Sequence, residues 1–383
     1  MTLLFHGAKK LDVNGQVDAF WMLVDGDSII AVGSGPQHPS ADERVDVGGG
    51  WLVPGFIDLH GHGGGGHSFD DGADEVLAAL AAHRAHGTTR SVISLVANPV
   101  ETLRKSLGGI ADLVASDPLV LGSHLEGPFL APGARGAHHP DFLLEPLPSI
   151  VDTLLDASRG TLRQLTIAPE LPNAFEAIDV LVENRVAVGI GHTEATFEVA
   201  KAAFDRGARL LTHAFNAMPG IHHRAPGPVV AAFEDGRVTI ELILDGTHVH
   251  PDVAAMVFRS APGRVALITD AMAAAGASDG DYRLGRLNVS VRAGLALLSG
   301  TQTIAGSTLM QDVALRCAIT KAHVSPREAV TALTATPARA LGLHRSLGQL
   351  APGFAADAVL LSHDWQVRAV WAAGRSVHPQ PTP

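Results

Sequence analysis

The stretch RVAVGIGHTEATFEVAKAAFDRGARLLTHAF, residues 185–215, decides the fold. Its two apolar runs, 185–192 and 208–215, flank an Ala-rich segment that is typical of a helix. The runs do not alternate apolar with polar residues, which indicates strands that are buried on both faces. A strand, a helix and a second strand in this order predict two parallel strands of one sheet.

The same pattern recurs along the middle of the chain. Most of the apolar runs are separated by helix-like segments such as DEVLAALAAHRAHG, residues 74–87. Eight such units over about 220 residues predict a closed (β/α)8 barrel of the TIM type, and so an α/β fold. The eight runs are LVPGFIDLH (52–60), TTRSVISLV (88–96), LVLGSHLE (119–126), LRQLTIAPE (162–170), RVAVGIGH (185–192), ARLLTHAF (208–215), VTIELILD (238–245) and RVALITD (264–270).

Both ends of the chain have a different, β-rich character. FWMLVDGDSIIAVG, residues 20–33, has two apolar runs around a turn, and short strand-like runs return in residues 355–375. Each end is too short to bury a core alone. We therefore expect residues 1–50 and 346–383 to form one small β-sandwich domain, with the barrel occupying residues 51–345.

Composition excludes several classes of protein. The 383 residues carry a net charge of −11, which argues against nucleic acid or an acidic membrane surface as a partner. The single cysteine, Cys317, excludes an intrachain disulfide and thiolate-rich metal sites, and we expect it to be buried. No apolar stretch is long enough to span a membrane, and the N-terminal apolar run is too short for a secretory signal. We expect a cytoplasmic protein.

Metal-ligating residues follow the predicted strands where each strand ends. In a barrel these ends meet on one face, where active sites form. His60 and His62 point to the same side of their strand, and Gly61 lets the backbone approach a metal. Each residue alone is more typical of a loop, a core histidine or a helix cap, but together they predict a metal site. The set is His60, His62, Glu126, His192, His213 and Asp270.

The chemistry of this set limits the metal. It offers imidazole and carboxylate groups without thiolate, which suits Zn, Fe, Mn or Co, with Zn the usual ion for hydrolysis. None of the five lysines, Lys9, Lys10, Lys105, Lys201 and Lys321, lies at the end of a predicted barrel strand.

Several motifs in the chain resemble a known family. PGFIDLHGHGG (54–64) and GQLAPGFAADAVLL (348–361) resemble the two ends of the amidohydrolase superfamily. Many members carry a carboxylated lysine on strand 4, where this chain has TIAPE instead. Six further motifs, in order, resemble the N-acetylglucosamine-6-phosphate deacetylase family within it. They are HLEGPF (124–129), GHTEAT (191–196), THAFNAM (212–218), DGTHV (245–249), TDAM (269–272) and AGSTL (305–309).

The resemblance implies hydrolysis of the N-acetyl group of N-acetylglucosamine 6-phosphate to glucosamine 6-phosphate and acetate. Glu126, His192 and His213 would then hold the principal divalent metal. His60 and His62 would hold a second metal that shares Glu126, so that each subunit binds one or two ions. A metal lowers the pKa of bound water to about 7.

Further roles follow from the same resemblance. Asp270 would act as the general base and then the general acid. His138 would contact the carbonyl oxygen, with His139 as the alternative, although His138 also fits a loop histidine. Ala137 precedes His138 in the substrate pocket.

The resemblance also implies how the phosphate is bound. Asn216, the backbone N–H of Ala217, Arg224 and His248 match the phosphate contacts, and arginine suits phosphate because of its planar fork. In several relatives the arginine and histidine reach in from a neighbouring subunit, which implies a homodimer. Arg224 also fits a surface ion pair. Ser307 fits either the sugar pocket or the cap of the following helix.

Two other functions remain open from the sequence. An amidohydrolase of this type could act on another N-acetyl sugar or on a cyclic amide; the missing strand-4 lysine argues against the cyclic amide, and the phosphate-binding set argues against an unphosphorylated sugar. A barrel that only binds ligands is the second alternative. It conflicts with the presence of the whole ligand set and of Asp270.

Overall fold

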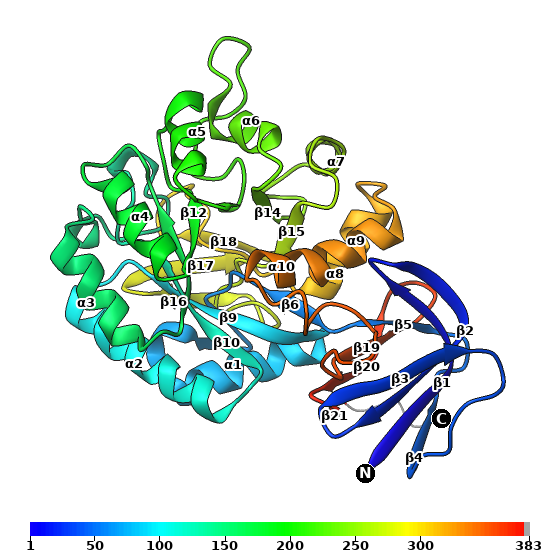
Figure 1. Cartoon of the computed structure of the whole chain (residues 1–383). Coiled ribbons are helices and arrows are strands. Elements are labelled where there is room, and N and C mark those ends of the chain that lie inside the picture. The colour runs from blue at the N-terminus through cyan, green and yellow to red at the C-terminus, as the bar shows by residue number, and fades with distance from the viewer. Residues whose placement is uncertain (379–383) are drawn as a thin grey trace.

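The computed structural model describes residues 1–378 and contains the predicted barrel (Figure 1). Eight parallel strands pair in the order of the chain, and one lies within each of the eight predicted runs. In the run 52–60 only Phe56–Asp58 belongs to the barrel, because the residues up to Pro54 pair in the other sheet. Most residues of the eight strands are buried, as strands covered on both faces require. The strands are β6 (Phe56–Asp58), β9 (Thr88–Val96), β10 (Val120–Glu126), β11 (Leu162–Ile167), β12 (Ala187–Ile190), β13 (Leu210–Leu211), β14 (Thr239–Ile243) and β15 (Val265–Ile268).

The barrel closes between β15 and β6, just beyond the ends of these two strands. Gly61 and Ala271 form a parallel bridge. Around it, the His62 N–H donates to the Ala271 carbonyl across 2.7 Å, and the Asp270 N–H donates to the His60 carbonyl across 2.8 Å. The closure therefore brings the first and the last of the predicted metal-ligating positions side by side.

Helices surround the barrel and cover its strands. The helix α5 (Phe197–Asp205) illustrates why they form: Thr196 caps its N-terminus by accepting from the Val199 N–H, and Ala200, Ala203 and Phe204 are its buried face. The other helices are α1 (Ala73–Ala85), α2 (Val100–Ser116), α3 (Pro148–Ser158), α4 (Ala174–Glu183), α6 (Gly227–Glu234), α7 (Pro251–Ser260), α8 (Gln311–Thr320), α9 (Pro326–Leu333) and α10 (Ala335–Ala340). Cys317 is buried on α8, as expected.

Strands from both ends of the chain share a second sheet, of eight strands, with its own apolar core. Residues 379–383, the end of the predicted terminal domain, lie outside the described residues. Within the described part the sheet extends to Pro54, and Gly55 separates it from β6. Its strands are β1 (Thr2–Asp12), β2 (Gly15–Asp25), β3 (Ser28–Ser34), β4 (Glu43–Asp46), β5 (Trp51–Pro54), β19 (Ala358–Leu361), β20 (Val367–Ala372) and β21 (Arg375–His378).

A buried ion pair joins the terminal sheet to the barrel. Arg90, on β9, lies 2.6 Å through its Nε from Asp357, which directly precedes β19. Asp357 also accepts from the Ala373 N–H across 2.7 Å. Since both charged side chains are under one tenth exposed, removing either one would leave the other buried without its partner.

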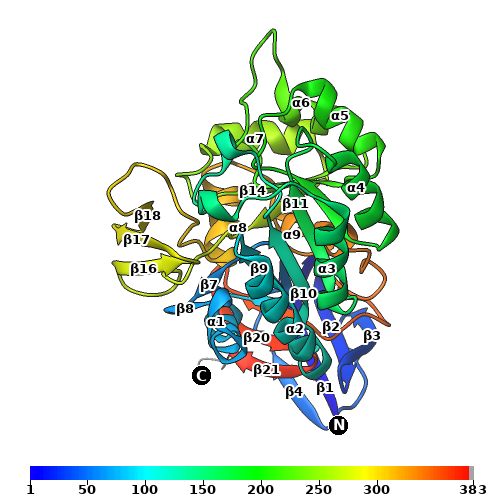
Figure 2. The same cartoon turned by 90° about the vertical axis from the view of Figure 1, so that its left-hand side faces the viewer.

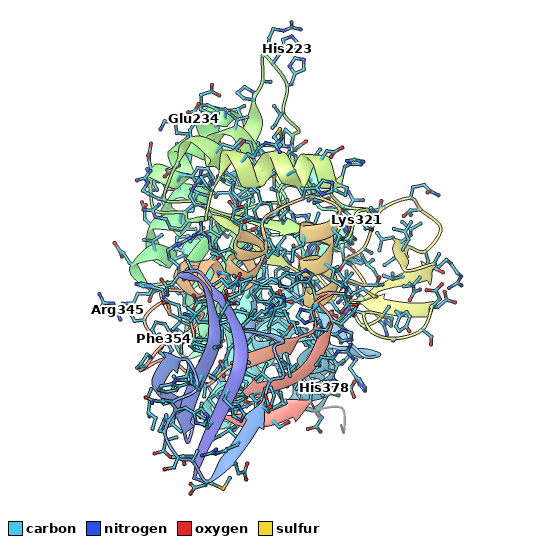
Figure 3. The ribbon with its side chains drawn as sticks, turned by 90° about the vertical axis from the view of Figure 1, so that its right-hand side faces the viewer. His223, Glu234, Lys321, Arg345, Phe354 and His378 are labelled. Carbon is cyan, nitrogen blue, oxygen red and sulfur yellow. The ribbon has the colours of Figure 1, made fainter. Side chains whose placement is uncertain are left out.

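Two insertions project from the barrel and matter for the site. The strands β16 (Gly280–Leu284), β17 (Leu287–Arg292) and β18 (Leu295–Leu298) form a small antiparallel sheet after β15, seen at the left of Figure 2. A loop between β13 and α6 extends far from the barrel and carries His223 at its tip (Figure 3). Short elements near the strand ends are β7 (Gly63–Gly64), β8 (His67–Ser68) and the 3-10 turns Phe69–Asp71, Pro132–Ala134 and Pro140–Phe142.

Candidate functional site

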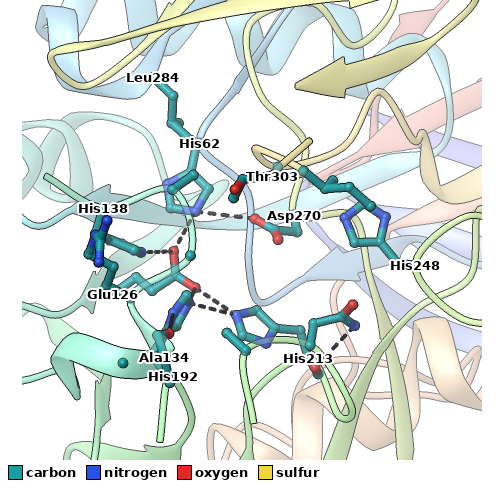
Figure 4. A pocket seen from close by; sticks show the side chains of 18 residues that line it. His62, Glu126, Ala134, His138, His192, His213, His248, Asp270, Leu284 and Thr303 are labelled. Atoms are coloured by element: carbon teal, nitrogen blue, oxygen red, sulfur yellow. Dashed lines mark hydrogen bonds and ion pairs between the residues drawn. The ribbon is translucent and has the colours of Figure 1, made fainter. Parts of the chain in front are cut away.

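Six side chains meet at the carboxyl ends of the barrel strands, with Glu126 at their centre. Figure 4 shows five of them, without His60. Its Oε1 lies 2.9 Å from His213 Nε2 and 3.0 Å from His192 Nε2. The same oxygen lies 3.2 Å from His60 Nε2, and its Oε2 lies 3.1 Å from His62 Nε2. We call this group the strand-end cluster: His60, His62, Glu126, His192, His213 and Asp270.

The strand-end cluster consists of two groups that share Glu126. The ligand atoms of His60, His62, Glu126 and Asp270 lie within 4.8 Å of one another, and so do those of Glu126, His192 and His213. Asp270 joins the first group through Oδ1, which is 3.3 Å from His62 Nε2. The family resemblance implies the same sharing of Glu126 between two metals, but it gives Asp270 the role of general base rather than a place in the second group.

The donor set fits divalent cations. The Nε2 atoms of His60 and His62 lie only 3.1 Å apart, and those of His192 and His213 lie 3.0 Å apart. In the neutral form that binds metal, two ring nitrogens that both present lone pairs repel at this separation, and a cation between them removes that repulsion. All four rings are at most 5% exposed, so water cannot easily take the place of the cation.

Unusual backbone angles aim these side chains inward. His192, His213 and Asp270 have φ values of 46°, 28° and 48°, in the left-handed region that residues with a Cβ rarely adopt. Each lies two residues beyond the end of its strand. Strain of this kind concentrates at functional sites because the surrounding structure must hold it.

The two carboxyl groups of the cluster are held as anions. Burial raises the pKa of Glu126, but the neighbouring charges of His60 and His192 outweigh it and bring that pKa well below its usual value. Burial also raises the pKa of Asp270. The charge of His60 and the hydrogen bond from His62 outweigh burial, so that this pKa is lowered. Both groups are therefore ionised and suited to bind cations.

His138 lies beside the cluster, on the loop that follows β10. Its Nδ1 accepts a hydrogen bond from the Ala97 N–H, and its Nε2 lies 3.3 Å from Glu126 Oε2. Burial lowers the pKa of His138 to about 4. The alternative residue, His139, does not line the cavity and stacks on Phe142 instead.

A cavity of about 480 Å³ opens above the strand-end cluster. The Oδ2 of Asp245 lies 2.7 Å from the Nδ1 of His248. His248 also lines the cavity, on the side of Asp270 (Figure 4). Burial opposes the positive charge of His248, but the hydrogen bond and charge of Asp245 raise its pKa above the ordinary value. The cavity is lined by His62, Glu126, Gly133, Ala134, Arg135, Gly136, Ala137, His138, His192, His213, Asn216, Ala217, His248, Asp270, Leu284, Thr303, Ile304 and Gly306.

Three predicted residues lie outside this lining. His60 is fully buried beneath the cavity, within the cluster. Arg224 is exposed on the projecting loop, where its Nη1 bonds to His223 Nε2 across 2.7 Å. Ser307 donates to the Thr269 carbonyl across 2.5 Å, and the N-cap of α8 is Met310. Ser307 therefore fastens the loop after β18 to the end of β15.

Some lining residues carry no signal in the sequence. Leu284 comes from β16, and Thr303 and Ile304 follow β18, so the inserted sheet forms one wall of the cavity. These residues are far along the chain from the ligand motifs, and their side chains have no distinctive chemistry. Only the fold brings them to the site.

Comparisons with known proteins agree with this geometry. A family profile described as "Amidohydrolase family" matches residues 51–377. N-acetylgalactosamine-6-phosphate deacetylase of Escherichia coli O157:H7 is 40% identical over 328 residues, which cover 85% of this chain and 87% of that protein. Human N-acetylglucosamine-6-phosphate deacetylase is 37% identical over 352 residues, which cover 88% and 86% of the two chains.

A solved structure is similar over the whole chain. It is an aspartate-to-alanine variant of N-acetyl-D-glucosamine-6-phosphate deacetylase from Mycobacterium smegmatis, in complex with N-acetyl-D-glucosamine-6-phosphate. It superposes with a TM-score of 0.93 at 43% identity, and covers 99% of each chain.

Proposed function

The chain belongs to the amidohydrolase family, and from this premise we propose that it releases acetate from N-acetylglucosamine 6-phosphate, leaving glucosamine 6-phosphate. The observation that carries the proposal is the position of the strand-end cluster at the floor of a cavity that also contains His248 and Asn216. That substrate carries an amide at one end and a phosphate at the other. The amide would lie at the strand-end cluster and the phosphate near His248.

We propose that the cluster binds one or two divalent cations per subunit, with Zn²⁺ as the ion. Glu126, His192 and His213 hold the principal cation, and His60 and His62 hold the second while Glu126 is shared. When bound, such a cation lowers the pKa of water to about 7 and polarises the acetyl carbonyl.

Asp270 moves the proton in this proposal. Its carboxylate borders the cavity and lies against His62. It accepts a proton from the water that attacks the acetyl carbon, and then delivers that proton to the sugar nitrogen when the C–N bond breaks. The leaving group departs as a neutral amine, and the second proton of the water stays on the acetic acid, which then ionises to acetate.

His138 stabilises the charge that develops on the acetyl oxygen. Because the Ala97 N–H donates to its Nδ1, the proton of the neutral ring is on Nε2, which faces the cluster. The low pKa of His138, caused by burial, keeps the ring neutral. A neutral, fixed N–H donor of this kind is suited to an oxyanion.

The phosphate lies at His248 in this proposal. The protonated ring, the Asn216 side chain and the Ala217 N–H supply donors from the same subunit, since all three residues line the cavity. Arg224 is exposed on the projecting loop. In this proposal it reaches the phosphate from a second copy of the chain, so that the functional unit is a homodimer.

The described residues include no helix with the length and apolar composition to cross a bilayer. We propose the cytoplasm as the location, in agreement with the single cysteine and with a phosphorylated substrate.

N-acetylgalactosamine 6-phosphate is the second candidate substrate. The Escherichia coli relative at 40% identity carries that name, and the two sugars differ only in the configuration at one carbon. A ratio of kcat/KM for the two sugar phosphates decides between them.

The test is acetate release from both sugar phosphates by protein whose metal content has been measured. We expect turnover that increases with bound divalent metal. If neither sugar phosphate were turned over with any of Zn²⁺, Fe²⁺, Mn²⁺ or Co²⁺, the proposed function would be contradicted.

A further inference from the structure

A carboxylate lies buried inside the barrel, behind the strand-end cluster. Glu241, on β14, is 0% exposed. Its Oε1 accepts a hydrogen bond of 2.7 Å from Gln164 Nε2, on β11, while its Oε2 has no hydrogen-bond partner among the described residues. Burying a carboxylate is costly unless it is fully bonded, so a single amide donor leaves this burial unexplained.

The free oxygen of Glu241 faces a free ring nitrogen. Its Oε2 lies 3.6 Å from His60 Nδ1, which also has no hydrogen-bond partner within residues 1–378. The opposite nitrogen, His60 Nε2, faces Glu126 and Asp270 at 3.2 and 3.6 Å. The ring therefore spans the space between the cluster and the buried carboxylate, and a shift of a few tenths of an ångström closes the bond.

The plane of the His60 ring is fixed from a third direction. His124 packs edge-on against it, with ring centroids 4.6 Å apart at 84°. His124 is itself held at both nitrogens, by Ser94 Oγ and Thr166 Oγ1, each at 2.9 Å. With its plane fixed, the remaining freedom of His60 is which nitrogen carries the proton.

We propose that Glu241 is the positioning residue of the second metal position: it accepts the Nδ1 proton of His60 and so leaves Nε2 free to bind the cation shared with His62. Histidine ligands usually donate their other ring N–H to a carboxylate or carbonyl, which fixes the tautomer and strengthens the ligand. His192 follows this rule, because its Nδ1 lies 2.9 Å from the Ala134 carbonyl. In contrast, the Nδ1 atoms of His62 and His213 have no such partner in the described chain.

The inference rests on the two-metal form of the proposed function, and its test uses metal binding rather than turnover. Metal-free protein is titrated with Zn²⁺ alone, by calorimetry and by elemental analysis after gel filtration. We expect two Zn²⁺ per subunit in the unaltered protein. In Glu241→Gln, which keeps the size of the side chain, the first binding step is unchanged and the second is weakened about 10- to 100-fold.

Two further variants separate positioning from folding. Glu241→Met removes both oxygens at similar volume and should weaken the second step at least as much as Glu241→Gln. Gln311→Leu is the matched control, since Gln311 is also fully buried in the barrel but bonds only to Thr88 and to the Ile57 and Leu267 carbonyls. It should reduce thermal stability and leave both Zn²⁺ affinities unchanged.

The Zn²⁺ titrations test the role of Glu241 without a measurement of acetate release. A selective loss of the second step, with the melting temperature of metal-free Glu241→Gln within about 3 °C of the unaltered protein, supports it. An unchanged second step, an equal loss of both steps, or a single Zn²⁺ in the unaltered protein would overturn it. A protein that passes this test yet releases no acetate contradicts the proposed function and leaves the positioning role standing.

Discussion

The Ala97 N–H donates a hydrogen bond to His138 Nδ1 across 3.2 Å, and this bond decides which nitrogen of the neutral ring carries the proton. With Nδ1 occupied as an acceptor, the neutral ring carries its proton on Nε2, 3.3 Å from Glu126. Ala97 directly follows β9 and His138 lies on the loop after β10, so two neighbouring strands set the tautomer.

We predict that His138→Ala lowers kcat about 10²- to 10³-fold, because it removes one donor to the oxyanion. KM should change much less, since the acetyl oxygen carries little charge before the transition state. Steady-state kinetics on metal-matched protein measure both constants. A variant that retains normal kcat would show that His138 does not serve the reaction.

The pH dependence of substrate binding should follow His248. The pKa of His248 is raised because the hydrogen bond and charge of Asp245 outweigh burial, so the imidazolium persists above the ordinary histidine range. We predict that KM for the phosphorylated sugar rises about tenfold as pH increases through this raised pKa, when the charge is lost. In His248→Gln the corresponding rise should be absent.

The titration of His248 should also make the free energy of unfolding depend on pH. Because the folded-state pKa of His248 is raised, its contribution to stability is full below the unfolded pKa of about 6.5 and disappears as pH rises through the folded value. The free energy of unfolding, measured with denaturant at several pH values, should lose this contribution in His248→Gln. If the free energy of unfolding of that variant decreased with rising pH as much as that of the unaltered protein, another group would be responsible.

Arg224 should act on a neighbouring subunit. Arg224→Ala and Asp270→Asn are each expected to be nearly inactive, one through weak phosphate binding and the other through proton transfer. When the two are mixed and allowed to exchange subunits, a hybrid dimer contains one site with its own Asp270 and the partner's arginine. About one quarter of the unaltered activity should return. No recovery after proven exchange would mean that Arg224 does not complete the partner's site.

Removal of the metal should affect stability as well as activity. A cation that binds only the folded chain stabilises it by about 4 kcal/mol at a thousandfold excess over its dissociation constant. We predict that dialysis against a chelator lowers the melting temperature and abolishes turnover, and that added Zn²⁺ restores both. Calorimetry before and after dialysis measures the change, and a melting temperature insensitive to the chelator would contradict metal binding at the strand-end cluster.

The barrel and the strand-end cluster could be predicted because their signals are local. Apolar runs of strand length alternate with Ala-rich segments, and the ligands lie at or near the ends of their runs, as His192 and His213 do. The parallel arrangement then forces these ends together. The boundary near residue 50 was harder to place, because LVPGFIDLH reads as one run although Gly55 divides it between two sheets.

The supporting parts of the site depend on tertiary structure. Glu241 stands in the middle of an apolar run, and nothing near it in the sequence indicates that it faces His60, which is 181 positions away along the chain. Thr303 and Ile304 follow an inserted sheet and line the cavity. No local sequence pattern specifies how that sheet packs against the barrel. Contacts of this kind are determined by packing between distant elements, and sequence periodicity does not describe them.

In the proposed reaction, deacetylation depends on bound metal and Asp270 carries the proton. The most direct measurement compares acetate release from N-acetylglucosamine 6-phosphate by the unaltered protein and by Asp270→Asn, at equal and measured metal content. We predict rapid release by the former and a loss of about 10²- to 10⁴-fold in the latter. Near-normal turnover by Asp270→Asn with its metal bound would contradict the account.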